Sequence, residues 1–280
     1  MVSLLKTPTM KHFLSLLLCL SAFSLHVWAQ KPLVIPLNPQ DTSAKAPTLT
    51  VYFPQNPNGM AIIACPGGGY AYLASRHEGH DMAAWMNTQG ILYAVLAYRM
   101  PNGDHTIPLS DAQAAITQVR THASEWNLNP NLIGIMGSSA GGHLASTLAT
   151  HYASATTRPD FQILLYPVIT MHPGITHAGS RENLLGPNPT QELEQLFSNE
   201  TQVNANTPPA FLMLSSDDNV VPPANSIDYF TALQQHGVPV TMHIYPYGGH
   251  GWGFGDSFGY KRSWTADLEK WLREMRAIRP

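Results

Sequence analysis

Residues 137–141 have the types and spacing of a serine nucleophile held at a sharp turn. They read Gly-Ser-Ser-Ala-Gly, a G-x-S-x-G pattern centred on Ser139. An apolar stretch precedes the pattern and a helix-forming stretch begins at Ala140, so a buried strand should turn directly into a helix. The first turn of that helix would present free N–H groups and a positive dipole end beside the serine. The segment therefore predicts nucleophilic chemistry through an anionic intermediate.

A second G-x-S-x-G pattern surrounds Ser257. It follows no apolar strand, and no histidine comes after it in the chain. The strand–turn–helix context that exposes a nucleophile is missing there. We therefore expect Ser257 to lie in a loop.

The histidine best placed to act as a base is His250, in Gly248-Gly249-His250-Gly251. It follows a predicted strand at 240–245, so a flexible loop would hold it at the carboxyl edge of a sheet, within reach of the serine. His172 and His177 also follow a predicted strand, but they would come before the acid and break the order serine, aspartate, histidine. We expect His250 to be the base.

The acid that orients this histidine should come from the interval between the nucleophile and the base. Asp217 and Asp218 directly follow a predicted strand, whereas Asp160 precedes its strand and Asp228 lies inside a predicted helix. The residues themselves do not separate Asp217 from Asp218, because either side chain could point up from the loop.

A run of three glycines leaves another predicted strand, in the segment Cys65-Pro66-Gly67-Gly68-Gly69-Tyr70. Glycines allow the backbone to approach a ligand closely and to present bare N–H groups. The run therefore predicts the second half of an oxyanion hole. Cys65 is expected to be buried, and Tyr70 either lines the substrate site or packs in the core.

Short apolar strands alternate with helices along the chain. Strands are predicted at 49–53, 60–65, 91–97, 132–136, 161–166, 210–215 and 240–245, and helices at 79–88, 111–126, 140–151, 223–236 and 263–278. This alternation predicts an α/β fold, with a mostly parallel central sheet and helices on both faces. Active residues of such sheets collect at the carboxyl ends of the strands, where the candidates above would lie.

Residues 1–29 have the features of a secretory signal peptide. Lys6 and Lys11 precede an apolar stretch at 13–25, and Ala29 ends a short segment suited to cleavage. The apolar stretch is too short for a comfortable membrane span. We expect cleavage after Ala29 and a secreted or periplasmic protein with no membrane span.

The remaining residues, 30–280, are predicted to form a single domain. Cys65 is their only cysteine, so no disulfide can form within them. A composition of 44% hydrophobic and 12% charged residues is typical of a globular protein with a large core. The chain has no basic cluster, so we expect no nucleic-acid partner.

Five segments together resemble the esterase branch of the α/β-hydrolase superfamily, and more narrowly the secreted bacterial acetyl-xylan esterase and feruloyl esterase-like group. They are PGGGY (66–70), HEG (77–79), GSSAGGH (137–143), DDNVVPPANS (217–226) and GGHGWG (248–253). The resemblance covers nearly all of residues 30–280, with the motifs in the same order. It implies an α/β-hydrolase fold and a catalytic triad of serine, aspartate and histidine.

The resemblance also implies roles for individual residues. The acid of this group stands four residues before the first proline of a D-x-x-V-P pattern, which selects Asp218 ahead of Pro222. The oxyanion donors correspond to Gly68, Gly69 and the amide of Ala140.

We therefore expect a secreted serine carboxylic-ester hydrolase that deacetylates acetylated plant polysaccharide or oligosaccharide and requires no metal or organic cofactor. Its expected partners are acetylated or feruloylated carbohydrate. The alternatives are a feruloyl esterase, a general short-chain carboxylesterase, an exopeptidase or a noncatalytic carbohydrate-binding protein. Polar residues dominate an inserted segment, 170–206, which we expect to rim a polar substrate. Tyr70, Trp252 and Phe254 are candidates to line the substrate site, and the alternative for each is a packing role in the core or in its loop.

Other polar residues have structural interpretations. His77 and His80 lack the H-E-x-x-H spacing of a zinc site, and no further ligand cluster accompanies them. Glu78 is expected to pair with Arg99. Asp111 and His143 are expected to be buried hydrogen-bonding residues.

Overall fold

The structure is a computed structural model that describes residues 31–278. The predicted signal peptide and its cleavage site lie outside the described residues. All of the elements below belong to the unit Pro32–Pro280.

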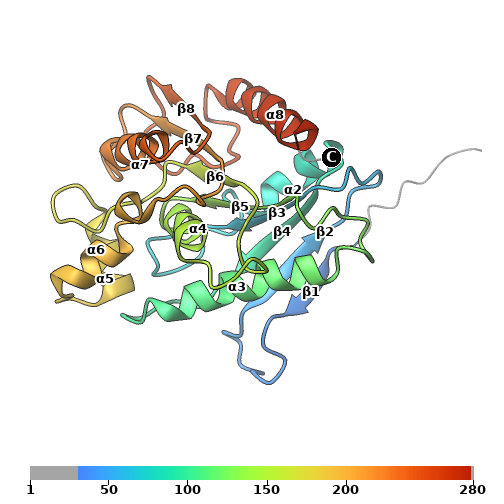
Figure 1. The fold of residues 1–280 in the computed structure, drawn as a ribbon, viewed down its shortest axis with the longest axis horizontal. Helices are drawn as coiled ribbons and strands as arrows, with labels where there is room; N and C mark the ends of the chain where they lie inside the picture. The colour runs from blue at the N-terminus through green and yellow to red at the C-terminus, as the bar shows by residue number, and fades with distance from the viewer. Residues whose placement is uncertain (1–30, 279–280) are drawn as a thin grey trace, which may run out of the picture. The chain divides into compact units, whose positions relative to one another are not determined.

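A twisted eight-stranded sheet forms the centre of this unit (Figure 1). Its order is β1-β2-β4-β3-β5-β6-β7-β8. The strands are β1 (Leu33–Pro36), β2 (Thr48–Tyr52), β3 (Ala61–Cys65), β4 (Leu92–Ala97), β5 (Ile133–Ser138), β6 (Gln162–Leu165), β7 (Ala210–Ser215) and β8 (Val240–Tyr245). β2 runs antiparallel to both β1 and β4, and every pair from β4 to β8 is parallel. The mostly parallel sheet predicted from the sequence is confirmed.

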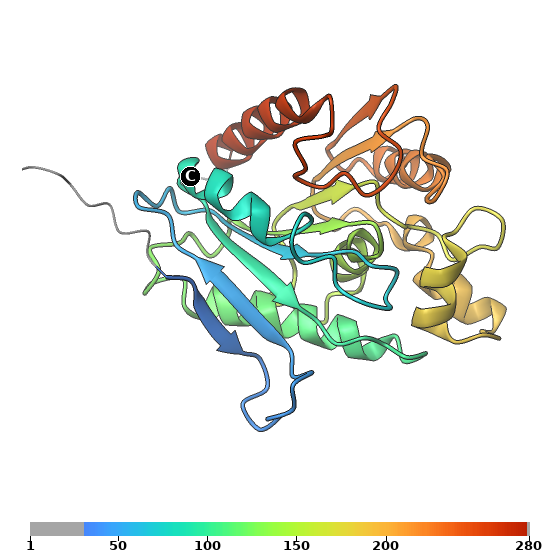
Figure 2. The same cartoon turned by 180° about the vertical axis from the view of Figure 1, so that it is seen from behind.

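Helices cover both faces of the sheet, as Figures 1 and 2 show from opposite sides. One face packs against α3 (Thr106–Thr121), α4 (Ala140–His151) and α7 (Ala224–Gln235), and the other against α2 (Ala83–Thr88) and α8 (Lys261–Ala277). Neighbouring strand residues alternate between the two cores, with Ile63 in the first and Ile62 in the second. Because both faces are buried, the central strands read as continuous apolar runs.

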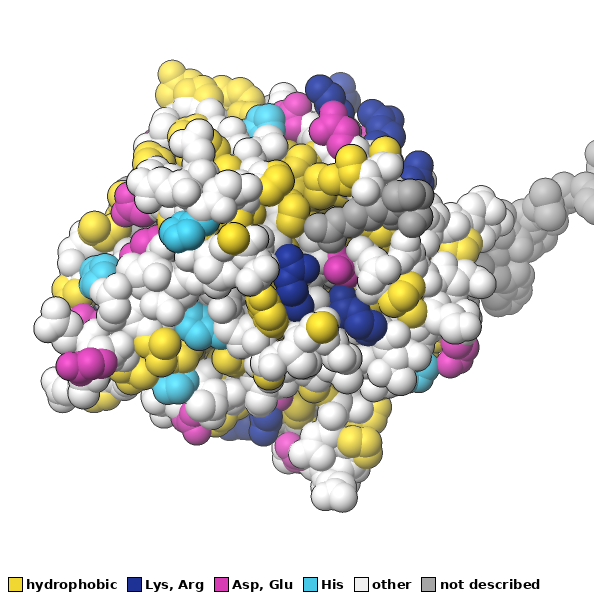
Figure 3. Space-filling model, viewed as in Figure 1, with side chains coloured by type: hydrophobic (Ala, Val, Ile, Leu, Met, Phe, Trp, Pro, Cys, Tyr) yellow, Lys and Arg dark blue, Asp and Glu magenta, His cyan; other side chains and the backbone are white. Residues whose placement is uncertain are grey.

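α8 shows how a helix with many charged residues still joins the core. Its buried residues follow helical spacing and include Trp264, Leu268 and Trp271. Its charged residues face outward, and Figure 3 shows basic side chains over this helix with acidic ones beside them. No helix among residues 31–278 is long and apolar enough to cross a membrane.

The seven predicted strands and five predicted helices are all present; β7, β8 and α4 keep their predicted ends, and the ends of the others are shifted. α3 begins five residues before its predicted start, with Pro108 in its first turn, where a missing N–H costs no helical hydrogen bond. β1 was not predicted, because its mostly exposed residues leave no alternation of burial. The inserted segment holds three further helices: α5 (Ala178–Leu185), α6 (Gln191–Phe197) and the short 3₁₀ helix η2 (Asn199–Gln202).

Candidate active site

Ser139 occupies the turn between β5 and α4, as the sequence predicts. Its backbone has φ 53° and ψ −123°, a region that residues with side chains rarely adopt. A side chain on Gly137 would overlap the Gly141 peptide, and one on Gly141 would overlap the carbonyl of Cys65. The two glycines of the pattern are therefore required by the close approach of strand, turn and helix.

Hydrogen bonds to the last residue of β6 and to the segment after it hold this turn in place. The Ser139 N–H donates to the Leu165 carbonyl over 3.0 Å, and the Ser139 carbonyl accepts from the Val168 N–H over 3.0 Å. The side chain remains directed at the carboxyl edge of the sheet, where it meets a histidine.

That histidine is His250, from the loop after β8. Its Nε2 lies 2.8 Å from the Ser139 hydroxyl, and its Nδ1 lies 2.7 Å from Oδ2 of Asp218. The three side chains thus form one continuous line of hydrogen bonds, although they come from three separate loops. With Nδ1 donating to the carboxylate, Nε2 carries a lone pair and can accept the serine proton.

The geometry separates the two neighbouring aspartates. Oδ1 of Asp218 accepts from the N–H groups of Val220 and Val221, each over 2.9 Å, which leaves Oδ2 for His250. The carboxylate of Asp217 instead accepts from the N–H groups of Gly248 and Gly249. Asp217 therefore contacts the backbone of the histidine loop, and Asp218 contacts the imidazole.

The glycine-rich loop after β3 lies beside the serine. Gly68 has φ 123° and Gly69 has φ 64°, conformations that favour glycine. Among the hydrogen bonds of residues 31–278, none uses the N–H of either glycine as donor. The N–H of Ala140 is the first of α4 and has no acceptor within the helix. All three donors predicted from the sequence therefore remain available for a ligand.

A cavity of about 360 Å³ opens at this edge of the sheet. Ser139 and His250 line it together with the glycine-rich loop and the residues after that loop, as far as Glu78. The inserted segment contributes His177 and Asn183. The Asn183 amide also donates to the Gly69 carbonyl over 2.8 Å, so this segment both closes one side of the cavity and braces the loop.

Three residues expected to line the substrate site do not line this cavity. Tyr70 is 2% exposed, and its hydroxyl pairs with Nδ1 of His143 over 2.9 Å. Trp252 is also buried and stacks on Phe258 at 4.1 Å between ring centroids. Phe254 faces a neighbouring hollow, beneath the ammonium group of Lys261. Of the two roles that the sequence left open for these residues, lining and packing, the structure has the packing role: the side chains pack around the loops of the site and do not line the cavity.

The expected pairing of Glu78 with Arg99 is wrong. Arg99 pairs with Asp111, whose carboxylate also accepts from the Arg99 N–H over 2.8 Å. Glu78 is buried and accepts from the Gly67 N–H over 2.7 Å. No sequence pattern predicts a hydrogen bond between the Glu78 side chain and the backbone of Gly67.

Other candidate histidines have structural partners. His143 is fully buried between the Tyr70 hydroxyl and the Phe197 carbonyl, as expected, and burial lowers its pKa to about 4. His177 caps α5, where its Nδ1 accepts from the Ser180 N–H over 3.2 Å. Burial lowers the pKa of His177, and the nearby His250 adds to this effect.

Of the remaining sequence candidates, His77 lines the cavity with Ser139, whereas His80 and Ser257 do not. Nδ1 of His80 lies 2.9 Å from the Tyr52 hydroxyl, and no three histidine, cysteine or acidic side chains within 31–278 form a group that could hold a metal ion. Ser257 is exposed in a turn before α8, as expected.

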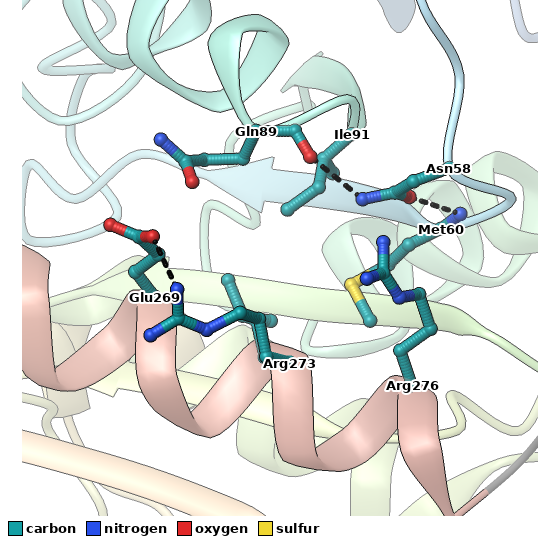
Figure 4. A pocket seen from close by; sticks show the side chains of 8 residues that line it. Asn58, Met60, Gln89, Ile91, Glu269, Arg273 and Arg276 are labelled. Atoms are coloured by element: carbon teal, nitrogen blue, oxygen red, sulfur yellow. Dashed lines mark hydrogen bonds and ion pairs between the residues drawn. The ribbon is translucent and has the colours of Figure 1, made fainter.

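A smaller cavity of about 100 Å³ lies between α8 and residues just before β3 and β4 (Figure 4). The Asn58 side chain there donates to the Gln89 carbonyl and accepts from the Met60 N–H, and Arg273 pairs with Glu269. This cavity is at the amino ends of its strands, away from the edge where catalytic groups of such sheets collect.

Comparison with known proteins agrees with this architecture. A model of the prolyl oligopeptidase family matches residues 82–277, more than half of the chain. The chain belongs to this family. The matched range of the prolyl oligopeptidase family contains Ser139, Asp218 and His250, and begins after the glycine-rich loop.

Among curated relatives, the chain is 42% identical over 233 residues to an acetylxylan esterase of Xylanibacter ruminicola, covering 82% of this chain and 48% of that protein. It is 39% identical over 204 residues to endo-1,4-β-xylanase B of Butyrivibrio fibrisolvens, covering 68% of this chain and 32% of that protein. The chain thus spans less than half the length of either relative.

Among solved structures, an acetyl ester-xyloside bifunctional hydrolase from Caldicellulosiruptor lactoaceticus superimposes with a TM-score of 0.80. It is 38% identical, and the alignment covers 89% of this chain and 98% of that one. The α/β-hydrolase fold implied by the sequence motifs is therefore confirmed, and so is the resemblance to acetylxylan esterases.

Proposed function

We propose that this protein is a secreted serine carboxylic-ester hydrolase that removes acetyl groups from acetylated polysaccharide or oligosaccharide. The observation that carries the proposal is the hydrogen-bonded line from Asp218 through His250 to Ser139, at the edge of a cavity. Three such groups in this order are the machinery of acyl transfer.

In the proposed reaction, Ser139 attacks the ester carbonyl while His250 accepts the hydroxyl proton at Nε2. Asp218 holds the imidazole in the required tautomer and stabilises its positive charge. The N–H groups of Gly68, Gly69 and Ala140 are the proposed donors to the anionic oxygen of the tetrahedral intermediate.

The leaving alcohol then takes the proton from His250, and the acetyl group remains on Ser139 as an ester. A water molecule repeats the attack with His250 as base, and collapse of the second intermediate releases acetate and restores the serine. The residues described here supply every proton transfer in this scheme.

The substrate assignment is supported by the relatives and by the side chains around the cavity. Two of the relatives are named for acetyl ester or acetylxylan hydrolysis. The inserted segment contributes the polar side chains His177 and Asn183 to the cavity, which suits a hydroxyl-rich leaving group. Tyr70 and Trp252 are buried, so neither can stack on a feruloyl group; the exposed aromatic side chain that lines the cavity is Tyr72.

The test is a set of kcat/KM values for p-nitrophenyl acetate, butyrate and octanoate, a feruloyl ester and peptide anilides, followed by acetate release from acetylated xylan. We expect acetyl esters to be cleaved best and peptides not at all. Ser139→Ala serves as the control for non-enzymatic hydrolysis. A preference for octanoate, or no acetate from any acetylated glycan, would refute the substrate assignment. Turnover of peptides but of no ester would refute the proposal that the protein is an esterase.

Secretion rests on residues 1–29 and needs its own test. Expression of the full chain should yield an extracytoplasmic protein whose first residue is Gln30, as read by mass spectrometry. An uncleaved cytoplasmic product in a secreting bacterial host would count against this part of the proposal.

A further inference from the structure

A buried carboxylate lies directly beneath the glycine-rich loop. Glu78 is 4% exposed, and each of its oxygens accepts a different hydrogen bond. Oε2 accepts from the Gly67 N–H over 2.7 Å, and Oε1 accepts from the Tyr166 hydroxyl over 2.8 Å. The reaction scheme above assigns Glu78 no step, yet a buried acidic side chain is costly unless its interactions compensate.

Tyr166 extends this connection toward the histidine loop. Its hydroxyl accepts from the Gly253 N–H over 2.7 Å, and its ring meets the His250 ring edge-on at 4.8 Å between centroids. Burial raises the pKa of Tyr166, and the nearby Glu78 charge adds to the effect. The hydroxyl therefore stays protonated and donates a hydrogen bond to the carboxylate. The backbone of Tyr166 has φ 35°, a strained conformation for a tyrosine.

The same carboxylate holds the loop that carries the proposed oxyanion donors at one peptide, and a backbone N–H holds it at the next. Gly67 is held at its N–H by Glu78 and at its carbonyl by the Ala74 N–H, over 2.9 Å. The Gly67 carbonyl and the Gly68 N–H belong to one planar trans peptide and point in opposite directions. Fixing the carbonyl therefore fixes the direction in which the Gly68 N–H points.

We propose that Glu78 and Tyr166 are positioning residues that couple the glycine-rich loop to the His250 loop, so that the oxyanion donors and the base are held at one spacing. This inference rests on the proposed function, because it assigns the two loops to one reaction. Neither residue touches the reacting atoms: Glu78 acts through the backbone of Gly67, which precedes the proposed donor Gly68, and Tyr166 acts through its contact with the His250 ring.

Glu78→Gln tests the link with little change in shape. If the new amide oxygen stays on the Gly67 N–H, its NH2 group faces the Tyr166 hydroxyl, which already accepts from Gly253. The hydroxyl proton then loses its acceptor, and the charge-assisted hydrogen bond to Glu78 is replaced by a weaker neutral one in the opposite direction, which weakens the path to the histidine loop. Tyr166→Phe removes the hydroxyl itself, so it breaks the path at the next bond.

The matched control is Tyr229→Phe. Tyr229 is also fully buried, and its hydroxyl donates to Oε1 of Gln162 over 3.1 Å, outside the cavity that holds Ser139. Tyr229→Phe removes one buried hydroxyl, as Tyr166→Phe does, without touching either loop; it breaks one hydrogen bond where Tyr166→Phe breaks two. Comparing the two separates general loss of stability from loss of positioning.

The measurements are kcat and KM for p-nitrophenyl acetate, the rate at which a fluorophosphonate labels Ser139, and the thermal unfolding midpoint. Misplacement of catalytic groups by about 1 Å can cost about 100-fold in rate. We expect kcat and labelling to fall about 10- to 100-fold in Glu78→Gln and Tyr166→Phe, with KM changed less than about 3-fold. The double variant should be little slower than the slower single variant, because both break one path.

The coupling would be overturned if both folded variants kept full kcat and labelling, or if their losses were no larger than in Tyr229→Phe. It would also be overturned if the losses in the double variant were multiplicative. Assays well below each unfolding midpoint keep a destabilised variant informative. A wild-type protein without ester turnover would count against the proposed function instead. The labelling rates would still test the coupling, since they require only a reactive serine.

Discussion

Replacing Asp218 by asparagine should nearly abolish turnover, for a reason visible in the hydrogen bonds of its two oxygens. Oδ1 accepts from the Val220 and Val221 N–H groups, and Oδ2 accepts from Nδ1 of His250. Asparagine has only one acceptor oxygen. The two N–H groups, of which the Val221 one is buried, would hydrogen-bond to that oxygen, so the NH2 group would face the imidazole.

That orientation reverses the histidine. Nδ1 of His250 would become the acceptor and Nε2 would carry the proton, 2.8 Å from the Ser139 hydroxyl. The imidazole could then no longer accept the serine proton. The equivalent substitution in a serine protease lowers kcat about 10⁴-fold, which corresponds to about 5 kcal/mol of activation free energy.

Asp217→Asn provides the comparison at the adjacent residue. Its amide oxygen can keep the 2.8 Å bond to the Gly249 N–H, and only the longer 3.3 Å bond to Gly248 is lost. A lost hydrogen bond of this kind costs about 1 kcal/mol, so kcat should fall no more than about 5-fold. Asp228→Asn, at an exposed position of α7, controls for the change of charge.

The assay is kcat for p-nitrophenyl acetate at pH 7.5 or so, with the unfolding midpoint measured for each variant. Equal losses in the two adjacent variants, or the larger loss at Asp217, would refute the assignment of the acid. Retention of more than about a tenth of kcat in a folded Asp218→Asn protein would refute the tautomer argument.

Ser139→Ala should lower kcat by about 10⁶, to near background, whereas Ser257→Ala should change it less than about 2-fold; a dead Ser257 variant would contradict the choice of nucleophile. EDTA should leave kcat unchanged, because the scheme uses a histidine base and backbone donors; loss of activity restored by zinc would instead favour a metal site at His77 and His80. Burial lowers the pKa of His143 from 6.5 to about 4, so the unfolded chain binds this proton first as the pH falls. The free energy of unfolding should therefore drop between about pH 6.5 and pH 4, by about 3 kcal/mol from this group. Urea unfolding at several pH values should show a shallower drop in His143→Gln, and an identical drop would refute the assignment.

Much of the fold could be predicted from local pattern. The predicted strands 60–65 and 132–136 are short apolar runs because both faces of the sheet are covered, which is a property of each run alone. β1 has no such signal, since its residues lie at an exposed edge. The helices of the segment 170–206 could not be predicted either, because they are short and only partly buried.

The sequence by itself determined the placement of Ser139 and His250, because each lies in a local context that only one geometry satisfies. A strand, a turn with two glycines and a helix leave the serine at the carboxyl edge. A glycine-rich loop after a strand leaves the histidine at the same edge. Parallel strands align these edges without further information.

Only the tertiary structure decided which neighbouring side chains meet. Asp217 and Asp218 have the same local context, and the difference arises from the β7–β8 pairing, which sets where the Gly248 and Gly249 N–H groups meet the loop after β7. The Glu78 carboxylate accepts hydrogen bonds from a backbone N–H and from the hydroxyl of Tyr166, which is 88 residues away in the chain. The physical reason is that hydrogen bonds act over about 3 Å, so their partners are fixed by the folded path of the chain and not by distance along the sequence.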